Sequence, residues 1–405
     1  MDKKRLFLWS LYDFANSIVF INFVLYFAQW IVVDGGLSDF WYNAIFAIAT
    51  VLLFLSAPIL ATFTDRHGGR KFFLNISTVG TFVSYGLAAL LAGLGQPNIF
   101  LIAVLFLLGQ YFYQLSFVFY NPMIEEIADT SHRARASGIG QFSNALGQVV
   151  GLLITLPLAD SRLAPLMPSV IIFFILALPM MIFYKESKQR DQNISIKTIK
   201  NETIIFKNKF ISFLSISLAT PMLLSFFFLS DAAVTVSNNY SIYMERVFSV
   251  PDKTKSILLM AILLMSAIGG ILAGWVGDKI GILKTYKLVL IGWIIALPAT
   301  ALASNFTVFI IITIIFGLLV GSMSSTSRAY MSTLLSSEDM GYGFSFYTIF
   351  ERFATFFGPL TWGGIIWYLG TTPSSYKIAM ATMAIFVIIG FVILGRWKRL
   401  TILNR

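Results

Sequence analysis

The sequence contains no cysteine, only two histidines and few charged residues. Without cysteine the chain cannot form a disulfide, a thiolate metal site or a cysteine nucleophile. His67 and His132 both lie in polar connections, so a proton relay inside the apolar segments must use carboxylates. Charged residues make up 12% of the 405 residues, against about 25% in soluble domains. Because 57% of the residues are hydrophobic and the mean hydropathy is +0.81, the composition indicates an integral membrane protein.

Basic residues outnumber acidic ones, which gives a net charge of +10. They gather in short connections on one side of the predicted membrane topology, where the positive-inside rule and anionic lipid explain them better than nucleic acid does. This distribution predicts that both termini are cytoplasmic. The basic residues at 3–5 are followed by an apolar run too long for a signal peptide, so we expect an uncleaved first span.

Twelve apolar runs are long enough to cross a bilayer as helices. They lie at 6–33, 40–63, 72–94, 99–121, 136–158, 168–184, 210–242, 256–276, 286–304, 307–330, 342–369 and 376–395. A basic stretch at 185–209 divides them into two sets of six. We therefore expect a half at 1–184, a cytoplasmic linker at 185–209 and a second half at 210–405.

The two sets resemble each other. The connection at 61–71 has the same pattern as the one at 274–284. Asp13 with Ser17 likewise recurs as Asp231 with Thr235, and the distance along the chain between these two pairs is nearly the same as that between the two connections. One half therefore duplicates the other. The sequence predicts an all-α membrane fold of twelve transmembrane helices in two pseudo-symmetric six-helix halves, and parallel halves with a central site are a transporter architecture.

Asp13, Asn16 and Ser17 share one face of the first predicted helix. A carboxylate near the centre of a bilayer costs about 2.5 kcal/mol or more, so a functional role is the default interpretation. The alternatives are a shallow position at the interface or a structural pair with another helix.

Four further spans carry polar stripes. The candidate residues are Gln114 and Asn121 in 99–121; Gln141, Asn144 and Gln148 in 136–158; Asp231, Thr235 and Asn238 in 210–242; and Glu351 and Arg352 in 342–369. Any one stripe could instead join two helices, at about 1 kcal/mol per contact. Together they predict a wet central cavity, whereas the glycines beside them at 140, 147 and 151 predict a close helix contact.

The charged candidates differ in their expected roles. Asp13 and Asp231 are candidate proton carriers or ligands of a substrate ammonium group, and Arg328 and Arg352 are candidate binders of carboxylate or phosphate. Internal pairing is the alternative for both arginines. Both signs of charge in one cavity suit an amino acid zwitterion. A sodium ion held by oxygens of Asp13, Asn16 and Ser17 is as compatible with the spacing as a proton is, and we expect no cofactor or other metal.

The duplicated connections carry a second set of charged residues: Asp65, Arg66, Arg70, Lys71, Asp278, Lys279 and Lys284. We interpret them as ion pairs that clamp a cytoplasmic gate in one state. The alternative is that their positive charges only set the topology.

Both connections resemble the loop motif Gly-x-x-x-Asp-Arg/Lys-x-Gly-Arg-Arg/Lys of the major facilitator superfamily, with Ala61 replacing the leading glycine of the first copy. A narrower resemblance, to the autophagy-related vacuole effluxer family and its bacterial relatives, is carried by the segments 9–17, 119–121, 135–140, 327–328 and 357–360. It implies a solute carrier, amino-acid export for the fungal members, and a bacterial inner membrane location. This chain departs from the family pattern at Ala232, Gln148 and Glu351-Arg352.

These observations predict a secondary active transporter that moves a small solute, most simply an amino acid, by alternating access of two rocking halves with proton coupling. A larger cargo such as a peptide, siderophore or drug is the first alternative. A non-transporting membrane receptor with a transporter fold is the second. We expect the protein to be a monomer. A membrane enzyme is disfavoured, because the sequence offers no cysteine, no histidine within a span and no metal-ligand spacing.

Overall fold

The computed structural model describes residues 2–94, 97–129, 132–187, 208, 211, 219–335 and 340–403, without the side chains of 65–66, 134, 340–342, 345 and 396–403. The described elements are all helical. The chain forms two compact units. Unit 1 comprises Met1–Leu37 and Ile48–Lys209, and unit 2 comprises Ser38–Ala47 and Phe210–Arg405. The predicted division at 185–209 falls largely outside the described residues and stays a prediction.

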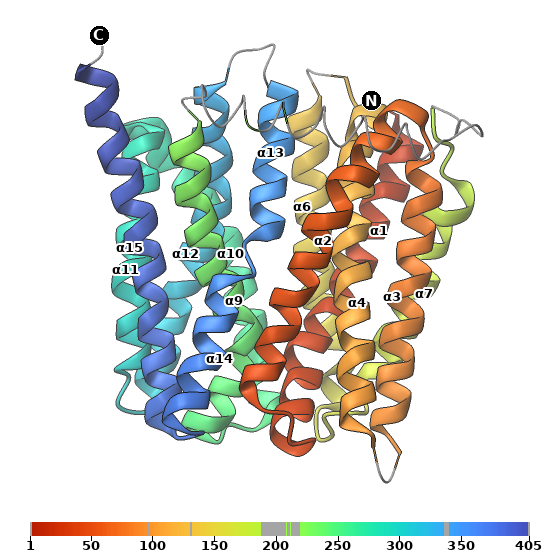
Figure 1. Cartoon of the computed structure of the whole chain (residues 1–405), viewed down its shortest axis with the longest axis vertical. Helices are drawn as coiled ribbons and strands as arrows, with labels where there is room; N and C mark the ends of the chain where they lie inside the picture. Colours follow the sequence, from red (N-terminus) through yellow and green to blue (C-terminus); the bar gives the residue numbers. More distant parts are fainter. Residues whose placement is uncertain are drawn as a thin grey trace. The chain divides into compact units, whose positions relative to one another are not determined.

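The helices from α1 to α7, labelled in Figure 1, belong to unit 1 apart from the start of α2. They are α1 (Lys3–Asn22), two π-helical segments η1 (Phe23–Phe27) and η2 (Trp30–Asp34), α2 (Asp39–His67), α3 (Arg70–Ala92), α4 (Ile99–Tyr120), η3 (Asn121–Met123), α5 (Ile124–Ile127), α6 (Arg133–Thr155), η4 (Leu156–Leu158) and α7 (Leu166–Phe183). Asp2 caps α1 by accepting hydrogen bonds from the N–H groups of Lys4 and Arg5. Asn98 caps α4 in the same way, so polar caps mark where the apolar helices begin.

Unit 2 contains the later helices. They are α9 (Thr220–Phe248), α10 (Asp252–Ile280), α11 (Ile282–Ala301), α12 (Phe306–Leu334), α13 (Met340–Phe353), α14 (Phe357–Leu369) and α15 (Pro373–Leu403). The first nine residues of α2 also belong to this unit, so α2 takes part in both units.

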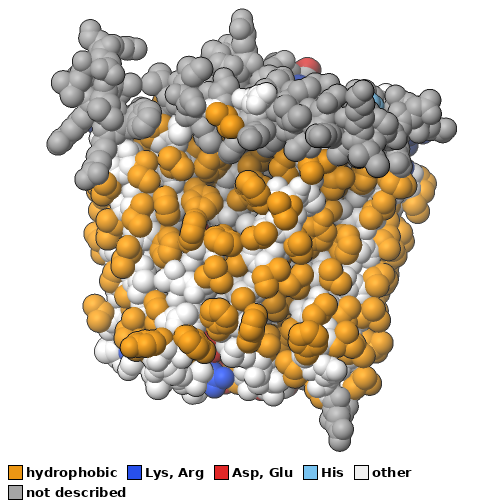
Figure 2. Space-filling view, in the orientation of Figure 1, with side chains coloured by type: hydrophobic (Ala, Val, Ile, Leu, Met, Phe, Trp, Pro, Cys, Tyr) orange, Lys and Arg blue, Asp and Glu red, His pale blue; other side chains and the backbone are white. Residues whose placement is uncertain are grey.

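Eleven helices among the described residues are long and apolar enough to cross a membrane. The predicted continuous span at 342–369 is wrong, because the helix breaks at 354–356 into α13 and α14, each too short alone. Counted together, the pair completes the twelve predicted spans. The surface is correspondingly apolar: Figure 2 shows hydrophobic side chains over the visible face, and Leu55, Ile271 and Trp367 are among the exposed ones. Such a surface suits lipid contact.

Glycines set the closest helix contacts within each unit. A Cβ built at Gly147 of α6 would lie 2.4 Å from the backbone oxygen of Phe14 in α1, so the two backbones touch there. In unit 2, a Cβ at Gly321 of α12 would lie 1.7 Å from the backbone oxygen of Ser266 in α10. The glycine face predicted for span 136–158 thus meets a neighbouring helix, α1, as small-residue faces do in membranes.

The start of α2 is held in unit 2 by buried polar contacts. Both carboxylate oxygens of Asp39 accept hydrogen bonds from the hydroxyl of Tyr376 at 2.9 Å. One turn further on, Asn43 and Asn239 donate to each other's side-chain oxygens at 3.0 and 2.8 Å. Since such groups are costly to leave unpaired in an apolar interior, these bonds fix the register of α2 in unit 2.

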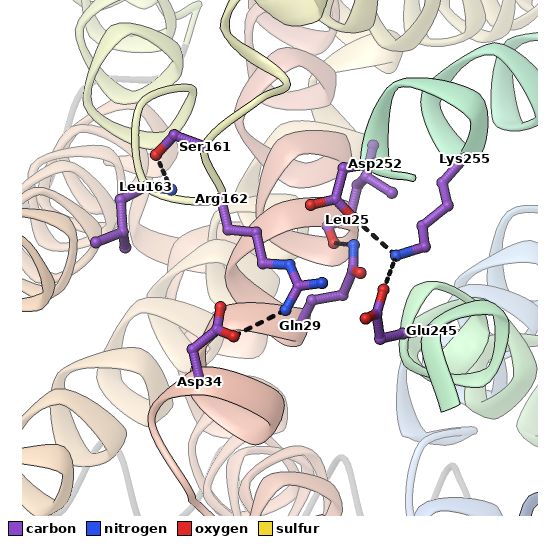
Figure 3. Close-up of polar contacts among 9 residues, drawn as sticks. All are labelled: Leu25, Gln29, Asp34, Ser161, Arg162, Leu163, Glu245, Asp252 and Lys255. Atoms are coloured by element: carbon purple, nitrogen blue, oxygen red, sulfur yellow. Dashed lines mark hydrogen bonds and ion pairs between the residues drawn. The ribbon is translucent and has the colours of Figure 1, made fainter. Parts of the chain in front are cut away.

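Ion pairs tie connections together in each unit, as Figure 3 shows separately for both. In unit 2, the fully buried amine of Lys255 binds Glu245 and Asp252, which joins the end of α9 to the start of α10. In unit 1, Arg162 donates to Asp34 at 2.9 Å, and this joins the loop after η4 to the end of η2. The two acidic partners offset the cost of burying the charged amine of Lys255.

Candidate functional site

Asp13 anchors a polar chain in unit 1. Its carboxylate, only 5% exposed, accepts a hydrogen bond of 2.9 Å from the amide nitrogen of Asn144 on α6. Gln148, one turn further on, donates to the oxygen of Asn144 at 2.8 Å. The close glycine contact between α1 and α6 brings the Asn144 amide within hydrogen-bond distance of Asp13. A buried carboxylate is therefore linked through two amides to a partly exposed side chain, Gln148.

Asn16 and Ser17 share the face of Asp13, as the helical spacing predicts, but their donors stay within α1. The amide of Asn16 donates to the backbone oxygen of Tyr12 at 3.1 Å, and the hydroxyl of Ser17 donates to that of Asp13 at 2.9 Å. Both side chains are 1% exposed. A sodium site built from their oxygens stays a prediction.

The remaining amide candidates of unit 1 differ in exposure. Gln114 in α4 and Asn121 in η3 are partly buried, whereas Gln141 in α6 is exposed. A common cavity for all three stays a prediction.

Aromatic rings surround Asp13, which the sequence reasoning missed. Trp9 and Tyr120 stack with their ring centroids 4.6 Å apart, and Tyr12 stacks on Tyr120 at 5.3 Å. The indole N–H of Trp9 donates to the backbone oxygen of Tyr120, whose hydroxyl donates to the backbone oxygen of Trp9. The available signal was the i, i+4 spacing of Trp9 and Asp13, which places both on one face of α1. Tyr12 and Tyr120 also interact electrostatically with the carboxylate of Asp13.

Asp231 occupies the break between α13 and α14 in unit 2. Its side chain is fully buried, and its Oδ2 accepts a hydrogen bond of 2.8 Å from the backbone N–H of Gly358, the second residue of α14. A carboxylate is favoured at a helix N-terminus, because the free N–H groups there carry partial positive charge. Gly358 also permits the approach, since a Cβ there would lie 2.3 Å from Oγ1 of Thr235.

Several buried polar atoms near Asp231 have no hydrogen-bond partner among the described residues. They are Oδ1 of Asp231, Oγ1 of Thr235, Oδ1 of Asn238 and Oγ of Ser230. All four side chains are at most 2% exposed and lie within nine residues of α9. Buried polar atoms are normally paired, so such a concentration marks a place where water, a proton or a ligand is expected.

The other charged candidates of unit 2 are Arg328 on α12 and Glu351 and Arg352 on α13, all partly buried. Arg328 and Glu351 act electrostatically on the hydroxyl of Tyr347, which is 2.8 Å from the hydroxyl of Ser327. Arg352 lies in the last turn of α13, where a cation is favoured by the helix dipole. The predicted carboxylate-binding role of the arginines stays a prediction.

The predicted gate residues of the first connection take part in an anchor within unit 1. Glu186 accepts hydrogen bonds from the backbone N–H groups of Gly69, Arg70 and Lys71 at 2.9, 2.8 and 3.2 Å. The amine of Lys71 donates to the backbone oxygen of Ile182 at 3.0 Å. The segment after α7 is therefore fastened to the first turn of α3.

The rest of the predicted gate lies partly outside the structure's description. The side chains of Asp65 and Arg66 are among those not described. Asp278, Lys279 and Lys284 are exposed, and the amine of Lys279 lies 3.5 Å from the ring centroid of Trp275. The ion-pair gate stays a prediction.

Replacing Glu186 with alanine should loosen the anchor on α3. Three backbone N–H groups lose a charged acceptor, which should cost about 1–2 kcal/mol of stability. The melting temperature of the purified protein measures this, with the exposed Glu125→Ala as the matched control. Equal melting temperatures for the two variants would remove the anchoring role of Glu186.

The fold and its paired polar clusters define a multi-pass helical membrane transporter, not an enzyme. The family model of the Major Facilitator Superfamily matches residues 10–235 and 222–401. The chain belongs to this superfamily.

Relatives and solved structures agree with this assignment. An uncharacterised MFS-type transporter, YxiO, of Bacillus subtilis (strain 168) is 24% identical over 414 residues, covering 96% of this chain and 93% of the relative. A protein of Aquifex aeolicus (strain VF5) is 26% identical over 363 residues, covering 88% and 87%.

Two solved structures share the fold at low identity. A bacterial homologue of the human lysosomal transporter Spinster has a TM-score of 0.77 at 16% identity, with 100% of this chain and 99% of that chain covered. The nucleoside transporter NupG has a TM-score of 0.70 at 12% identity, with 97% and 99% covered. At such identities the likeness concerns the fold alone.

Proposed function

We propose that this transporter moves a small zwitterionic solute, most simply an amino acid, by alternating access coupled to protons. The observation that carries the proposal is the pair of buried carboxylates, Asp13 and Asp231, at matching positions of the two repeated halves. Each is at most 5% exposed; Asp13 accepts a hydrogen bond from the amide of Asn144, and Asp231 accepts one from the backbone N–H of Gly358. Acidic side chains inside transmembrane segments commonly mark proton or substrate pathways.

The surroundings of each carboxylate support a polar solute. In unit 1, Gln148 ends the amide chain that begins at Asp13, and a partly exposed amide can donate and accept hydrogen bonds at once. In unit 2, Arg352 lies two residues before the helix break at which Asp231 is bound. Acidic and basic groups beside amides match a molecule that carries an ammonium and a carboxylate.

Membrane orientation belongs to the same proposal. The basic residues in the connections favour cytoplasmic termini, and the bacterial relatives favour a bacterial inner membrane. Rocking of two six-helix halves is supported by the duplicated sequence and by the division into two compact units.

Thermal stabilisation of the purified protein tests the solute class. Amino acids, dipeptides, organic acids and nucleosides are added separately, and a compound at 100 times its Kd should stabilise the native state by about 2.7 kcal/mol. We expect an amino acid to raise the melting temperature of the wild type but not of Arg352→Ala, whereas Asp13→Asn, which keeps the side-chain volume and an acceptor oxygen, should still bind it. Stabilisation only by a larger or uncharged compound would refute the zwitterion proposal and favour another cargo.

A further inference from the structure

The helix break in unit 2 presents an unusual set of donors. α14 begins inside the predicted span 342–369 and ends at Leu369, and in its first turn the N–H of Gly358 donates to the buried carboxylate of Asp231. The amide of Gly358 is used by Asp231, and the next residue, Pro359, has no N–H. Helix N-termini of this kind bind anions through backbone donors and the helix dipole.

A second observation also points to a ligand at this place. The hydroxyl of Thr235 is fully buried and has no hydrogen-bond partner among the described residues. It faces the first turn of α14, since a Cβ built at Gly358 would lie 2.3 Å from its Oγ1 and 3.0 Å from Oδ1 of Asp231. A hydroxyl donor beside a backbone N–H donor is the pair that the two oxygens of a carboxylate accept.

We propose that the N-terminus of α14, beside Thr235, is a carboxylate-binding subsite for the solute, and that the carboxylate of Asp231 occupies it in this structure. The inference rests on the proposed zwitterionic solute and assigns that solute's carboxylate to backbone and hydroxyl donors. The incoming carboxylate accepts hydrogen bonds from Gly358 and Thr235, and Asp231 gives up its bond to Gly358. Solute binding is thereby coupled to Asp231, because two carboxylates at one helix end repel each other.

The charges around the break favour this assignment. Among the helices packed on α9, α14 carries no acidic or basic residue, α13 carries Glu351 and Arg352, and α12 carries Arg328. Lys377 near the start of α15 donates to the backbone oxygen of Ala303. The charged side chains of these helices are thus mainly basic, and the helix end adds partial positive charge, so an anion is preferred to a cation.

Chemical rescue tests the subsite without the natural solute. Asp231→Ala removes the internal carboxylate and leaves the donors of Gly358 and Thr235 free. Saturating acetate should raise the melting temperature of the full-length Asp231→Ala protein by about 2 °C or more beyond its effect on the wild type. Acetamide, of similar shape but uncharged, should not. Asp13→Ala is the control, because it removes the matching carboxylate of the other half, which accepts its described hydrogen bond from a side-chain amide inside α6.

A second variant decides the matter if Asp231→Ala does not fold. Asp231→Asn keeps the side-chain volume and an acceptor for the Gly358 N–H, but a neutral amide is displaced more easily by an anion. Acetate should therefore stabilise Asp231→Asn more than the wild type. Equal acetate effects on the wild type and on both Asp231 variants, or rescue of Asp13→Ala to the same extent, would overturn the subsite.

The outcomes separate this inference from the proposed function. If acetate rescues the Asp231 variants while no amino acid stabilises the wild type, the subsite stands and the zwitterionic solute is wrong. If leucine stabilises the wild type, leucinamide does so equally, and acetate rescues nothing, the subsite is wrong. The proposal of amino-acid transport then remains, with the solute carboxylate bound elsewhere.

Discussion

Replacing Asp13 with asparagine is expected to reduce gradient-driven uptake to background while the protein stays folded. Asparagine keeps the volume and an acceptor oxygen for the amide of Asn144, which donates to Asp13 at 2.9 Å. It cannot take up a proton, so the step that ties transport to the gradient is lost. Uptake into proteoliposomes under an imposed pH gradient measures this, with the compound that stabilises the purified protein as the transported solute.

Exchange of solute without a gradient should survive in the same variant, because it needs binding and rocking but no net proton movement. Asp34→Asn is the matched control. Asp34 pairs with Arg162 and its side chain is 44% exposed, so its neutralisation should leave driven uptake near the wild-type rate. Driven uptake at the wild-type rate in Asp13→Asn would refute the coupling role. A sodium gradient that drives the wild type but a pH gradient that does not would identify the other ion.

Replacing Gly321 with alanine should destabilise unit 2 strongly. The added Cβ would lie 1.7 Å from the backbone oxygen of Ser266, so α10 and α12 must move apart. Overpacking of a tight interface costs about 3 kcal/mol at the upper end of its usual range. The loss exceeds the gain in helix propensity of about 1 kcal/mol that glycine-to-alanine replacement brings.

Gly274→Ala is the matched control for this replacement, because a Cβ at Gly274 of α10 meets no atom within 4 Å. We expect Gly274→Ala to melt at or slightly above the wild-type temperature and Gly321→Ala to melt well below it or to be recovered in low yield. If both variants melt together, α10 and α12 do not approach as closely as described.

Several features of the candidate site were predictable from local pattern. Helical spacing placed Asp13, Asn16 and Ser17 on one face, and the glycines of span 136–158 predicted a neighbour that proves to be α1. The direction of hydrogen bonds was not predictable. Asn16 and Ser17 donate within their own helix, whereas Asn144 reaches across to Asp13. Such choices depend on which backbone or side chain lies nearest in space, and spacing along one helix carries no information about that.

The sequence by itself determined the membrane class, the apolar spans and the paired acidic residues of the repeated halves, because hydropathy and periodicity act over one helix at a time. Only the tertiary structure decided that span 342–369 breaks at 354–356, that Asp231 binds the N–H of Gly358 there, and that residues 39–47 of α2 belong to unit 2. Each of these features joins segments far apart in the chain. A local sequence pattern cannot identify the partner in such a contact, because a buried donor or acceptor is paired with whichever group the fold brings close to it.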